Sequence, residues 1–279
     1  MSKETFSGKH FQNLSSFIQD NYGIKMPDSK QVMLESRLRR RMRQTGYDSI
    51  DDYLEYVFSP EGRRDELVHM VDTVTTNKTD FFREPVHFTI LCDQIIPRII
   101  AGKAFSGSSR LRIWSSACST GEEPYTLAMV LHEFAERNGS LRYSILASDL
   151  STRVLKIAHR AVYNEEQIQD IPLRLREKYL LRSKDRSLGL VQIREHLRES
   201  VTFRRINLMA DDFDLREKMH IIFCRNVLIY FAKNAQERLM HKFADLLEPG
   251  GFLFIGHSES LAGMEVPFTS VAQTVYQKK

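Results

Sequence analysis

The segment that most constrains the fold runs from residue 112 to residue 131. An apolar run at 112–117 enters a turn of small residues at 118–121, which two acids, Glu122 and Glu123, and a helix-like stretch follow. This order predicts a strand, a tight turn and a helix, where small residues let a ligand approach the backbone. Acids after the turn would repel a pyrophosphate, so they favour a nucleoside without phosphates. A turn with one glycine is often purely structural, so the prediction needs support elsewhere.

Three further apolar runs end in polar residues. They end at Asp149, at Asn207 with Leu208, and at Arg225 with Asn226. Asp149 can accept hydrogen bonds from both ribose hydroxyls, or it can cap the helix expected at 152–159, and neither interpretation prevails on this residue alone. Because ligands bind outside the carboxyl ends of parallel strands, the four strand ends together predict one cofactor crevice.

The C-terminal part predicts how the sheet closes. A helix is expected at 234–247, a turn at 248–251, a strand at 252–256 and a last strand near 270–276. Two closing strands without a long helix between them imply an antiparallel edge. This α/β pattern resembles class I S-adenosylmethionine-dependent methyltransferases more than nicotinamide-binding domains.

The composition is that of a folded protein with room for two domains, since 42% of the 279 residues are hydrophobic and 27% are charged. The first residues lack an apolar signal core, and Arg225 and Asn226 interrupt the most apolar stretch, so we expect a cytoplasmic protein without membrane insertion. Cys92, Cys118 and Cys224 lie too far apart to suggest a metal site, and they are typical of a reducing compartment.

Arginines crowd one helical segment near the start. Leu34, Leu38 and Met42 recur every four residues and predict a helix docked by one face. Its other faces would attract phosphate or carboxylate partners, or they are simply solvated. The candidate substrate-binding residues are Arg37, Arg39, Arg40 and Arg43. Residues 1–72 are expected to form a basic all-helical domain, and residues 73–279 a second domain.

Several motifs, in order along nearly the whole chain, resemble the CheR family of chemoreceptor methyltransferases. The family implies a helical N-terminal domain followed by a class I S-adenosylmethionine-dependent methyltransferase domain with a small antiparallel β insert. The motifs are Thr76-Asn77 with Thr79 and Phe81-Phe82-Arg83, Ser119 to Tyr125, Ala147-Ser148-Asp149, Phe223 to Val227 with Ile229-Tyr230-Phe231, and Gly256-His257-Ser258-Glu259.

The resemblance also implies an activity and a set of site residues. The activity is methyl transfer from S-adenosylmethionine to glutamates of the cytoplasmic helical bundle of chemoreceptors, which gives methyl esters in chemotaxis adaptation. Nucleic acid is not an expected partner. The reaction centre would hold Arg83 and Tyr230. The implied cofactor contacts are Asn77, Thr79, Arg83, one or both of Glu122 and Glu123, Asp149, Asn207, Leu208, Arg225 and Asn226.

The roles of the two reaction-centre residues can be argued from chemistry. A glutamate side chain in water has a pKa of about 4.3, so it is already ionised at neutral pH and needs no general base. Arg83 can anchor a carboxylate of either cofactor or substrate, and Tyr230 can present a hydroxyl or its ring to a sulfonium. The structural alternatives are an ion pair of Arg83 with Glu84 or Asp80, and a core position for Tyr230.

The β insert is expected at about 172–203, with strands at 178–181, 190–194 and 201–203. In some members of the resembled family this insert binds a peptide from the receptor's carboxyl terminus by strand addition. The residues do not show whether this chain does so.

Three other functions fit parts of the sequence. Residues 256–260 imitate the G-x-S-x-G elbow of serine hydrolases, but Ser260 replaces the last glycine and residues 261–263 are too short for the helix that must follow. A methyltransferase acting on nucleic acid or on another protein is the main alternative, although residues 224–227 lack the proline-aromatic tetrapeptide of amino-methylating enzymes. A module that binds cofactor without turnover also stays open.

Overall fold

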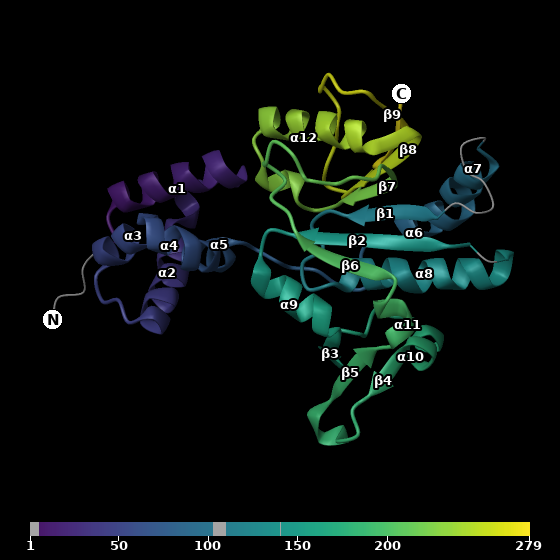
Figure 1. Cartoon of the computed structure of the whole chain (residues 1–279), viewed down its shortest axis with the longest axis horizontal. Coiled ribbons are helices and arrows are strands. Elements are labelled where there is room, and N and C mark those ends of the chain that lie inside the picture. Colours follow the sequence, from purple (N-terminus) through teal and green to yellow (C-terminus); the bar gives the residue numbers. More distant parts are fainter. Residues whose placement is uncertain (1–5, 103–109, 140) are drawn as a thin grey trace.

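The structure is a computed structural model that describes residues 6–102, 110–139 and 141–279. A small helical domain lies beside a larger domain built around a sheet, and a small β insert projects from the larger one (Figure 1). No helix in these residues is long and apolar enough to cross a membrane.

The small domain is a cluster of helices whose buried faces follow the apolar spacing of the sequence. Leu34, Leu38 and Met42 are buried, as the four-residue spacing predicts. Ser7 caps the first helix by accepting a hydrogen bond from His10 N, and Gly23 ends it at φ 71°. The helices are α1 (Gly8–Tyr22), α2 (Gln31–Thr45), α3 (Ile50–Phe58), α4 (Pro60–Asp65) and α5 (Leu67–Val74), with a 3₁₀ turn, η1 (Asp28–Lys30), before α2.

The larger domain holds a seven-stranded sheet in the order β6-β2-β1-β7-β8-β10-β9. Its first five strands are parallel, and β10 is antiparallel to both neighbours. From β1 the chain adds β2 and β6 on one side of the sheet and then β7 and β8 on the other, so the strand order reverses between β1 and β7. Ligands bind at this point in such sheets. The strands are β1 (Leu111–Ser115), β2 (Tyr143–Asp149), β6 (Val201–Arg205), β7 (Met219–Cys224), β8 (Leu247–Ile255), β9 (Phe268–Ala272) and β10 (Val275–Lys278).

Helices cover both faces of this sheet, so its strands are apolar on both sides. Ile113 of β1 packs into one core and its neighbour Trp114 into the other. The first face carries α8 (Glu122–Asn138) and the run α6 (Val86–Ile90), η2 (Leu91–Ile95) and α7 (Ile96–Ala101), while α12 (Lys233–Leu246) packs on the second. Helix α9 (Thr152–Arg160) follows β2.

The C-terminal edge differs from the prediction in two respects. Strand β8 begins at Leu247 and includes residues 248–251, which were expected to form a turn. The single last strand expected near 270–276 is a hairpin of β9 and β10, with a turn where Thr274 has φ 55°. No glycine or proline marks that turn, so the sequence reads as one continuous strand.

The insert is a three-stranded antiparallel sheet in the order β3-β5-β4. The assignment of residues 201–203 to the insert is wrong, because they belong to β6, the strand that ends before Asn207 and pairs with β2 of the main sheet. The missing third strand is β3 (Val162–Asn164), before the expected start of the insert, and three residues are too few to show a period. The other elements are β4 (Leu180–Arg182), β5 (Leu190–Ile193), α10 (Leu173–Tyr179), η3 (Arg186–Leu188) and α11 (Glu195–Arg198).

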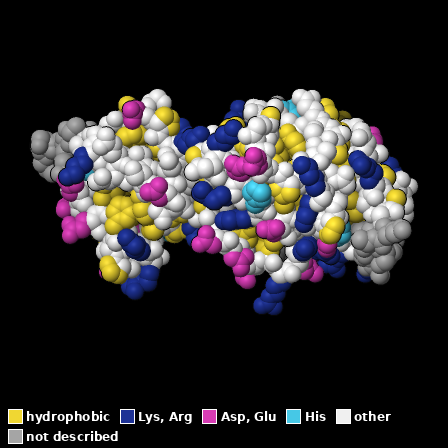
Figure 2. All heavy atoms as spheres, turned by 90° about the horizontal axis from the view of Figure 1, so that it is seen from above, with side chains coloured by type: hydrophobic (Ala, Val, Ile, Leu, Met, Phe, Trp, Pro, Cys, Tyr) yellow, Lys and Arg dark blue, Asp and Glu magenta, His cyan; other side chains and the backbone are white. Residues whose placement is uncertain are grey.

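Several contacts hold the domains together, among them a backbone contact at Ile24 and a buried carboxylate at Asp72. In the connection between α1 and α2, Ile24 forms a β-bridge with Phe231, and Lys25 N donates to Tyr230 O at 2.8 Å. At the other contact, buried Asp72 of α5 accepts hydrogen bonds from Thr152 N, Thr152 Oγ1 and Arg153 N at 2.8–3.1 Å. Asp72 thus supplies a negative charge to the N-terminus of α9 from another domain. The space-filling view shows the narrow waist where the domains meet (Figure 2).

Candidate cofactor site

One pocket lies at the carboxyl ends of β1, β2, β6 and β7, where the small domain closes against them. The structure brings every predicted cofactor and reaction-centre residue except Glu122 into its lining. These residues are Asn77, Thr79, Arg83, Glu123, Asp149, Asn207, Leu208, Arg225, Asn226 and Tyr230.

The turn after β1 contains small residues for two different reasons. Ser116, Ala117 and Ser119 line the pocket, as expected where a ligand approaches the backbone. Gly121 does not: its φ is 100°, and a Cβ there would lie 2.8 Å from Tyr163 Oη and 2.9 Å from Ala158 Cβ. Glycine is therefore required for the packing of this turn against α9 and β3, and not for ligand access.

Asp149 is buried at the tip of β2 and faces the pocket. Its Oδ2 accepts from Ser119 N and its Oδ1 from Ser151 N, both at 2.9 Å. Burial raises the pKa of Asp149, and these amide hydrogen bonds oppose the rise. The caps of α9 are Ser151 and Asp72. Asp149 therefore keeps free lone pairs for a ligand hydroxyl.

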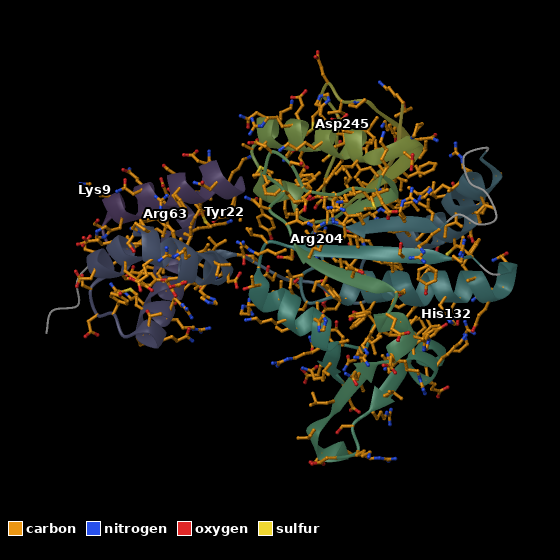
Figure 3. All side chains as sticks on the ribbon, viewed as in Figure 1. Lys9, Tyr22, Arg63, His132, Arg204 and Asp245 are labelled. Carbon is orange, nitrogen blue, oxygen red and sulfur yellow. The ribbon has the colours of Figure 1, made fainter. Side chains whose placement is uncertain are left out.

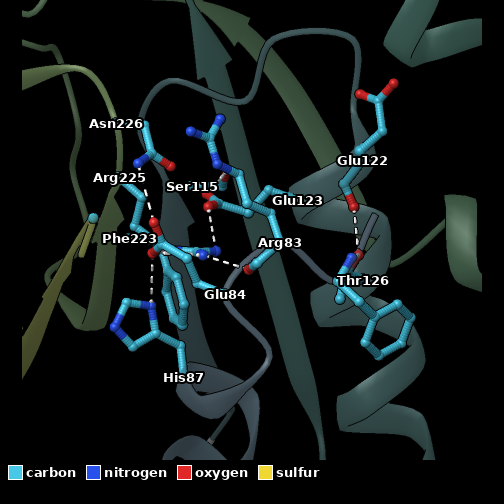
Figure 4. Close-up of polar contacts among 12 residues, drawn as sticks. Arg83, Glu84, His87, Ser115, Glu122, Glu123, Thr126, Phe223, Arg225 and Asn226 are labelled. Atoms are coloured by element: carbon cyan, nitrogen blue, oxygen red, sulfur yellow. Dashed lines mark hydrogen bonds and ion pairs between the residues drawn. The ribbon is translucent and has the colours of Figure 1, made fainter. Parts of the chain in front are cut away.

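The two acids after the turn point in different directions (Figure 4). Glu123 lines the pocket, where Oε1 accepts from Ser115 Oγ at 2.7 Å and Oε2 pairs with Arg225 Nη1 at 3.1 Å. Glu122 is 2% exposed and accepts from Thr120 Oγ1 at 2.7 Å, outside the pocket. Successive helix residues point about 100° apart, so only one of the pair can face a ligand.

We expect Glu122 to lower stability at alkaline pH. Burial raises the pKa of Glu122 to about 7, above its ordinary value, so the unfolding free energy falls as pH rises from about 4.5 through 7. The unfolding free energy of Glu122→Gln, relative to that of the wild type, should rise by on the order of 2 kcal/mol when the pH is raised from 5 to 8. Urea titrations at the two pH values measure this gain, and an equal difference at both would contradict a protonated Glu122.

Arg225 forms the centre of a buried ion-pair network (Figure 4). Its side chain is 2% exposed, and it donates to Glu84 Oε2 at 3.0 and 3.3 Å, to Glu123 and to Arg83 O. Glu84 Oε1 accepts from Asn226 Nδ2 and from His257 N, each at 3.1 Å. Burial alone would raise the pKa of Glu84, but Asn226 and Arg225 hold it at about 2. Arg225 therefore acts mainly on protein groups, although it lines the pocket.

The backbone around Arg83 is held in an uncommon conformation. Phe82 and Glu84 have φ values of 51° and 56°, and Ser119 and Asn226 at the same pocket have 48° and 57°. Left-handed residues other than glycine cost energy and persist where their surroundings hold them. Thr126 Oγ1 accepts from Phe82 N, and Arg225 binds the Arg83 carbonyl, which fixes the segment from both sides.

The side chain of Arg83 stays available for a ligand. Within the described part of the chain it donates only to Lys78 O, at 3.3 Å, and no carboxylate lies at ion-pair distance from it. The alternative ion pair with Glu84 or Asp80 is not present, because Glu84 pairs with Arg225. Arg83 is thus a pocket cation whose fork can bind a carboxylate.

The small domain contributes pocket residues that the sequence did not indicate. Tyr22, Ile24, Met26 and Lys30 line the pocket. Tyr22 ends α1 and faces the larger domain (Figure 3), and Lys30 Nζ lies 5.3 Å from the ring centroid of Tyr230. Their role depends on how the domains pack, which no local pattern encodes.

The predicted substrate-binding arginines of α2 lie outside the pocket. Arg37 Nη1 donates to Val74 O and Thr75 O at 2.9 Å, and Arg39 pairs with Glu35 at 2.8 Å. Arg40 and Arg43 are exposed. Of the four, only Arg40 and Arg43 therefore present a guanidinium mainly to solvent.

One group of side chains has the composition of a metal site. Ligand atoms of Glu84, His87 and His257 lie within 4.8 Å of one another. Burial lowers the pKa of His87 to about 3, so it is neutral, but the carboxylate of Glu84 already binds the guanidinium of Arg225. A second cation would repel that guanidinium, so the geometry favours a structural network.

The fold and pocket define a class I S-adenosylmethionine-dependent methyltransferase. The antiparallel β10, which lies between β8 and the edge strand β9, and the pocket at the strand tips belong to that class. The lining fits the cofactor: Asp149 has lone pairs for sugar hydroxyls, Ser116 and Ala117 leave room at the β1 tip, and Arg83 can bind a carboxylate.

The chain belongs to the CheR methyltransferase family. Residues 9–75 match the family's CheR methyltransferase all-alpha domain, and residues 77–277 match its CheR methyltransferase SAM binding domain. The protein is therefore a methyltransferase that binds S-adenosylmethionine.

Three proteins named chemotaxis protein methyltransferase are each 37% identical to this chain. The Escherichia coli protein aligns over 97% of this chain and 91% of its own length. The Borreliella burgdorferi protein aligns over 90% and 87%, and chemotaxis protein methyltransferase 2 of Pseudomonas aeruginosa over 97% and 93%. The likeness thus spans both domains.

Proposed function

We propose that this protein transfers the methyl group of S-adenosylmethionine to glutamate side chains of bacterial chemoreceptors, which gives glutamate methyl esters. The relatives' names support an acceptor from the chemotaxis system. The observation that carries the proposal is Arg83, a pocket guanidinium without a carboxylate partner among the described residues, in a pocket that Tyr230 also lines.

The pocket suits an acceptor that needs orientation and loss of water, and not deprotonation. A glutamate is ionised at neutral pH, so no residue has to remove a proton. When bound, S-adenosylmethionine supplies the methyl group from a positively charged sulfur. We assign Asp149 and Asn207 to holding the cofactor's polar groups, Arg83 to anchoring a carboxylate, and Tyr230, which lines the pocket, to the reaction centre.

A panel of acceptors tests the proposal. Radioactive methyl should pass from S-adenosylmethionine to a receptor cytoplasmic fragment and not to a fragment whose modified glutamates are replaced by alanine. Duplex DNA, RNA and an unrelated acidic helical protein serve as parallel acceptors. Label on nucleic acid or on the unrelated protein alone would support the alternative methyltransferase functions, and cofactor binding without any label would indicate a binding module.

Two substitutions of Tyr230 should separate the role of its ring from that of its hydroxyl. If the ring attracts the cofactor's positive charge, Tyr230→Phe should keep most of kcat and Tyr230→Ala should lose it at least about tenfold. Steady-state methylation of the receptor fragment measures both variants. A phenylalanine variant as slow as alanine assigns the role to the hydroxyl, whereas two fully active variants remove Tyr230 from the reaction centre.

We also propose that the β insert can receive a receptor peptide by strand addition. Strand β4 is an outer strand of the small sheet, and Leu181 and Arg182 on it are exposed. Leu173, 66% exposed, lies beside this strand in a cavity that Leu180 and Arg182 also line. Removing the receptor's C-terminal peptide should then raise KM with kcat unchanged, and an unchanged KM would contradict this docking mode.

A further inference from the structure

The exposed face of α9 carries only positive charge. Arg153, Lys156 and Arg160 are exposed and recur at intervals of three and four residues, which places them on one face, while Val154 and Ala158 are buried opposite them. Helix α9 contains no Asp or Glu. Among the residues with assigned positions, none of these three side chains has a carboxylate at ion-pair distance.

The long surface helix α12 of the larger domain is different. The outer face of α12 mixes Lys233, Glu237, Arg238 and Asp245. Basic and acidic side chains are also interspersed over the larger domain on the face seen in Figure 2. Mixed charge is typical of a solvated face, so the single sign on α9 is a local exception.

The fold places this face beside the basic helix of the other domain. Asp72 binds the first turn of α9, and Arg37 of α2 binds the backbone that follows α5. Burial lowers the pKa of Arg37, and the nearby charges of Arg153 and Arg40 lower it further. The two basic helices lie on the same side of the molecule as the insert (Figure 1). Positive side chains that lie close together despite their mutual repulsion are typical of a surface that binds an anionic partner.

This surface adjoins the pocket. Val74 and Thr75, whose carbonyls bind Arg37, line the pocket, and so does Leu150, which precedes Ser151, the N-cap of α9. A partner that lies across α2 and α9 therefore reaches the edge of the site where the methyl group is transferred.

We propose that α9 is part of the docking surface for the acidic helical segment that carries the modified glutamates, so that the substrate contacts both domains at once. This inference rests on the proposed function. A segment whose glutamates are methylated carries clustered carboxylates, and the complementary surface extends from Arg40 of α2 to Arg153, Lys156 and Arg160 of α9.

A pair of charge variants tests the inference. In the first, Arg153→Gln is combined with Lys156→Glu; glutamine avoids a second carboxylate next to Asp72. The matched control combines Lys233→Gln with Arg238→Glu on α12 and changes the same amount of charge. We expect KM for the receptor fragment to rise about tenfold at low salt in the α9 variant only, with unchanged affinity for S-adenosylhomocysteine. Salt should raise the wild-type KM more than that of the variant.

A photo-crosslinker at position 156 gives a second readout, which holds even if the charge variant folds poorly. It should capture the receptor fragment, whereas the same group at position 238 should not. Equal KM values for both charge variants, together with no adduct at 156, would overturn the inference. The inference would also be overturned if the α9 variant bound duplex DNA more weakly than the wild type but had an unchanged KM for the receptor fragment. Failure of the wild type to methylate the fragment would instead refute the proposed function.

Discussion

Replacing Asp149 by alanine should weaken binding of S-adenosylhomocysteine by about 2 to 4 kcal/mol, the range for lost charge-assisted hydrogen bonds. Asp149 lies at the β2 tip, faces the pocket and has lone pairs beyond those used by Ser119 N and Ser151 N. Without the carboxylate, sugar hydroxyls lose their acceptor, and two amides at the turn lose theirs. Calorimetry on the folded variant measures the loss.

Glu122→Gln is the control for this experiment. It changes a buried acid near the same turn, but Glu122 does not line the pocket, so affinity should stay at the wild-type value. Unchanged affinity in the Asp149 variant would remove this residue from the cofactor site. An equal loss in both variants would assign the effect to distortion of the turn.

Replacing Glu84 by glutamine should lower the unfolding free energy by about 3 kcal/mol, because Arg225 would keep a buried charge without its main partner. The same change loosens the segment that holds Arg83, whose carbonyl binds Arg225. Affinity for S-adenosylhomocysteine should therefore fall too. Urea unfolding and calorimetry measure the two effects.

The pH dependence and a control make this prediction specific. The hydrogen bond from Asn226 and the ion pair with Arg225 hold the pKa of Glu84 at about 2, below its ordinary value, so the stabilisation is present above pH 4.5 and is lost as pH falls through 2. The difference in unfolding free energy between the wild type and Glu84→Gln should therefore become smaller as the pH falls over that range. Glu35→Gln, which breaks the more exposed pair with Arg39, should cost less than about 1 kcal/mol. If Glu84→Gln lost as little unfolding free energy as Glu35→Gln, the stabilising role of the ion-pair network around Arg225 would be contradicted.

The sequence predicts the parts of this protein that depend on local pattern. The runs ending at Asp149 and Asn226 are long and apolar, and the sheet brings their ends to one pocket, as expected for parallel strands. The four-residue spacing in α2 also predicts its buried face. By contrast, β3 is too short to show a period, and the turn between β9 and β10 lacks a turn residue.

Other features depend on packing between distant segments. Which of Glu122 and Glu123 faces the pocket depends on the rotation of α8 about its axis, which the adjacent acids do not reveal. The pairing of Glu84 with Arg225 joins residues far apart in the chain, so the sequence offered for Glu84 only the local alternative, an ion pair with Arg83. Lys30 reaches Tyr230 only because the two domains meet there.

Locating the methyl group on the acceptor tests the central claim most directly. After incubation of the wild-type protein with S-adenosylmethionine and a receptor cytoplasmic fragment, peptide mass spectrometry should place the added methyl on glutamate side chains. Mild alkali should release it as methanol, because it is held as an ester. Methyl groups that resist alkali, or that map to lysine, arginine or an added nucleic acid, would contradict a glutamate methyltransferase.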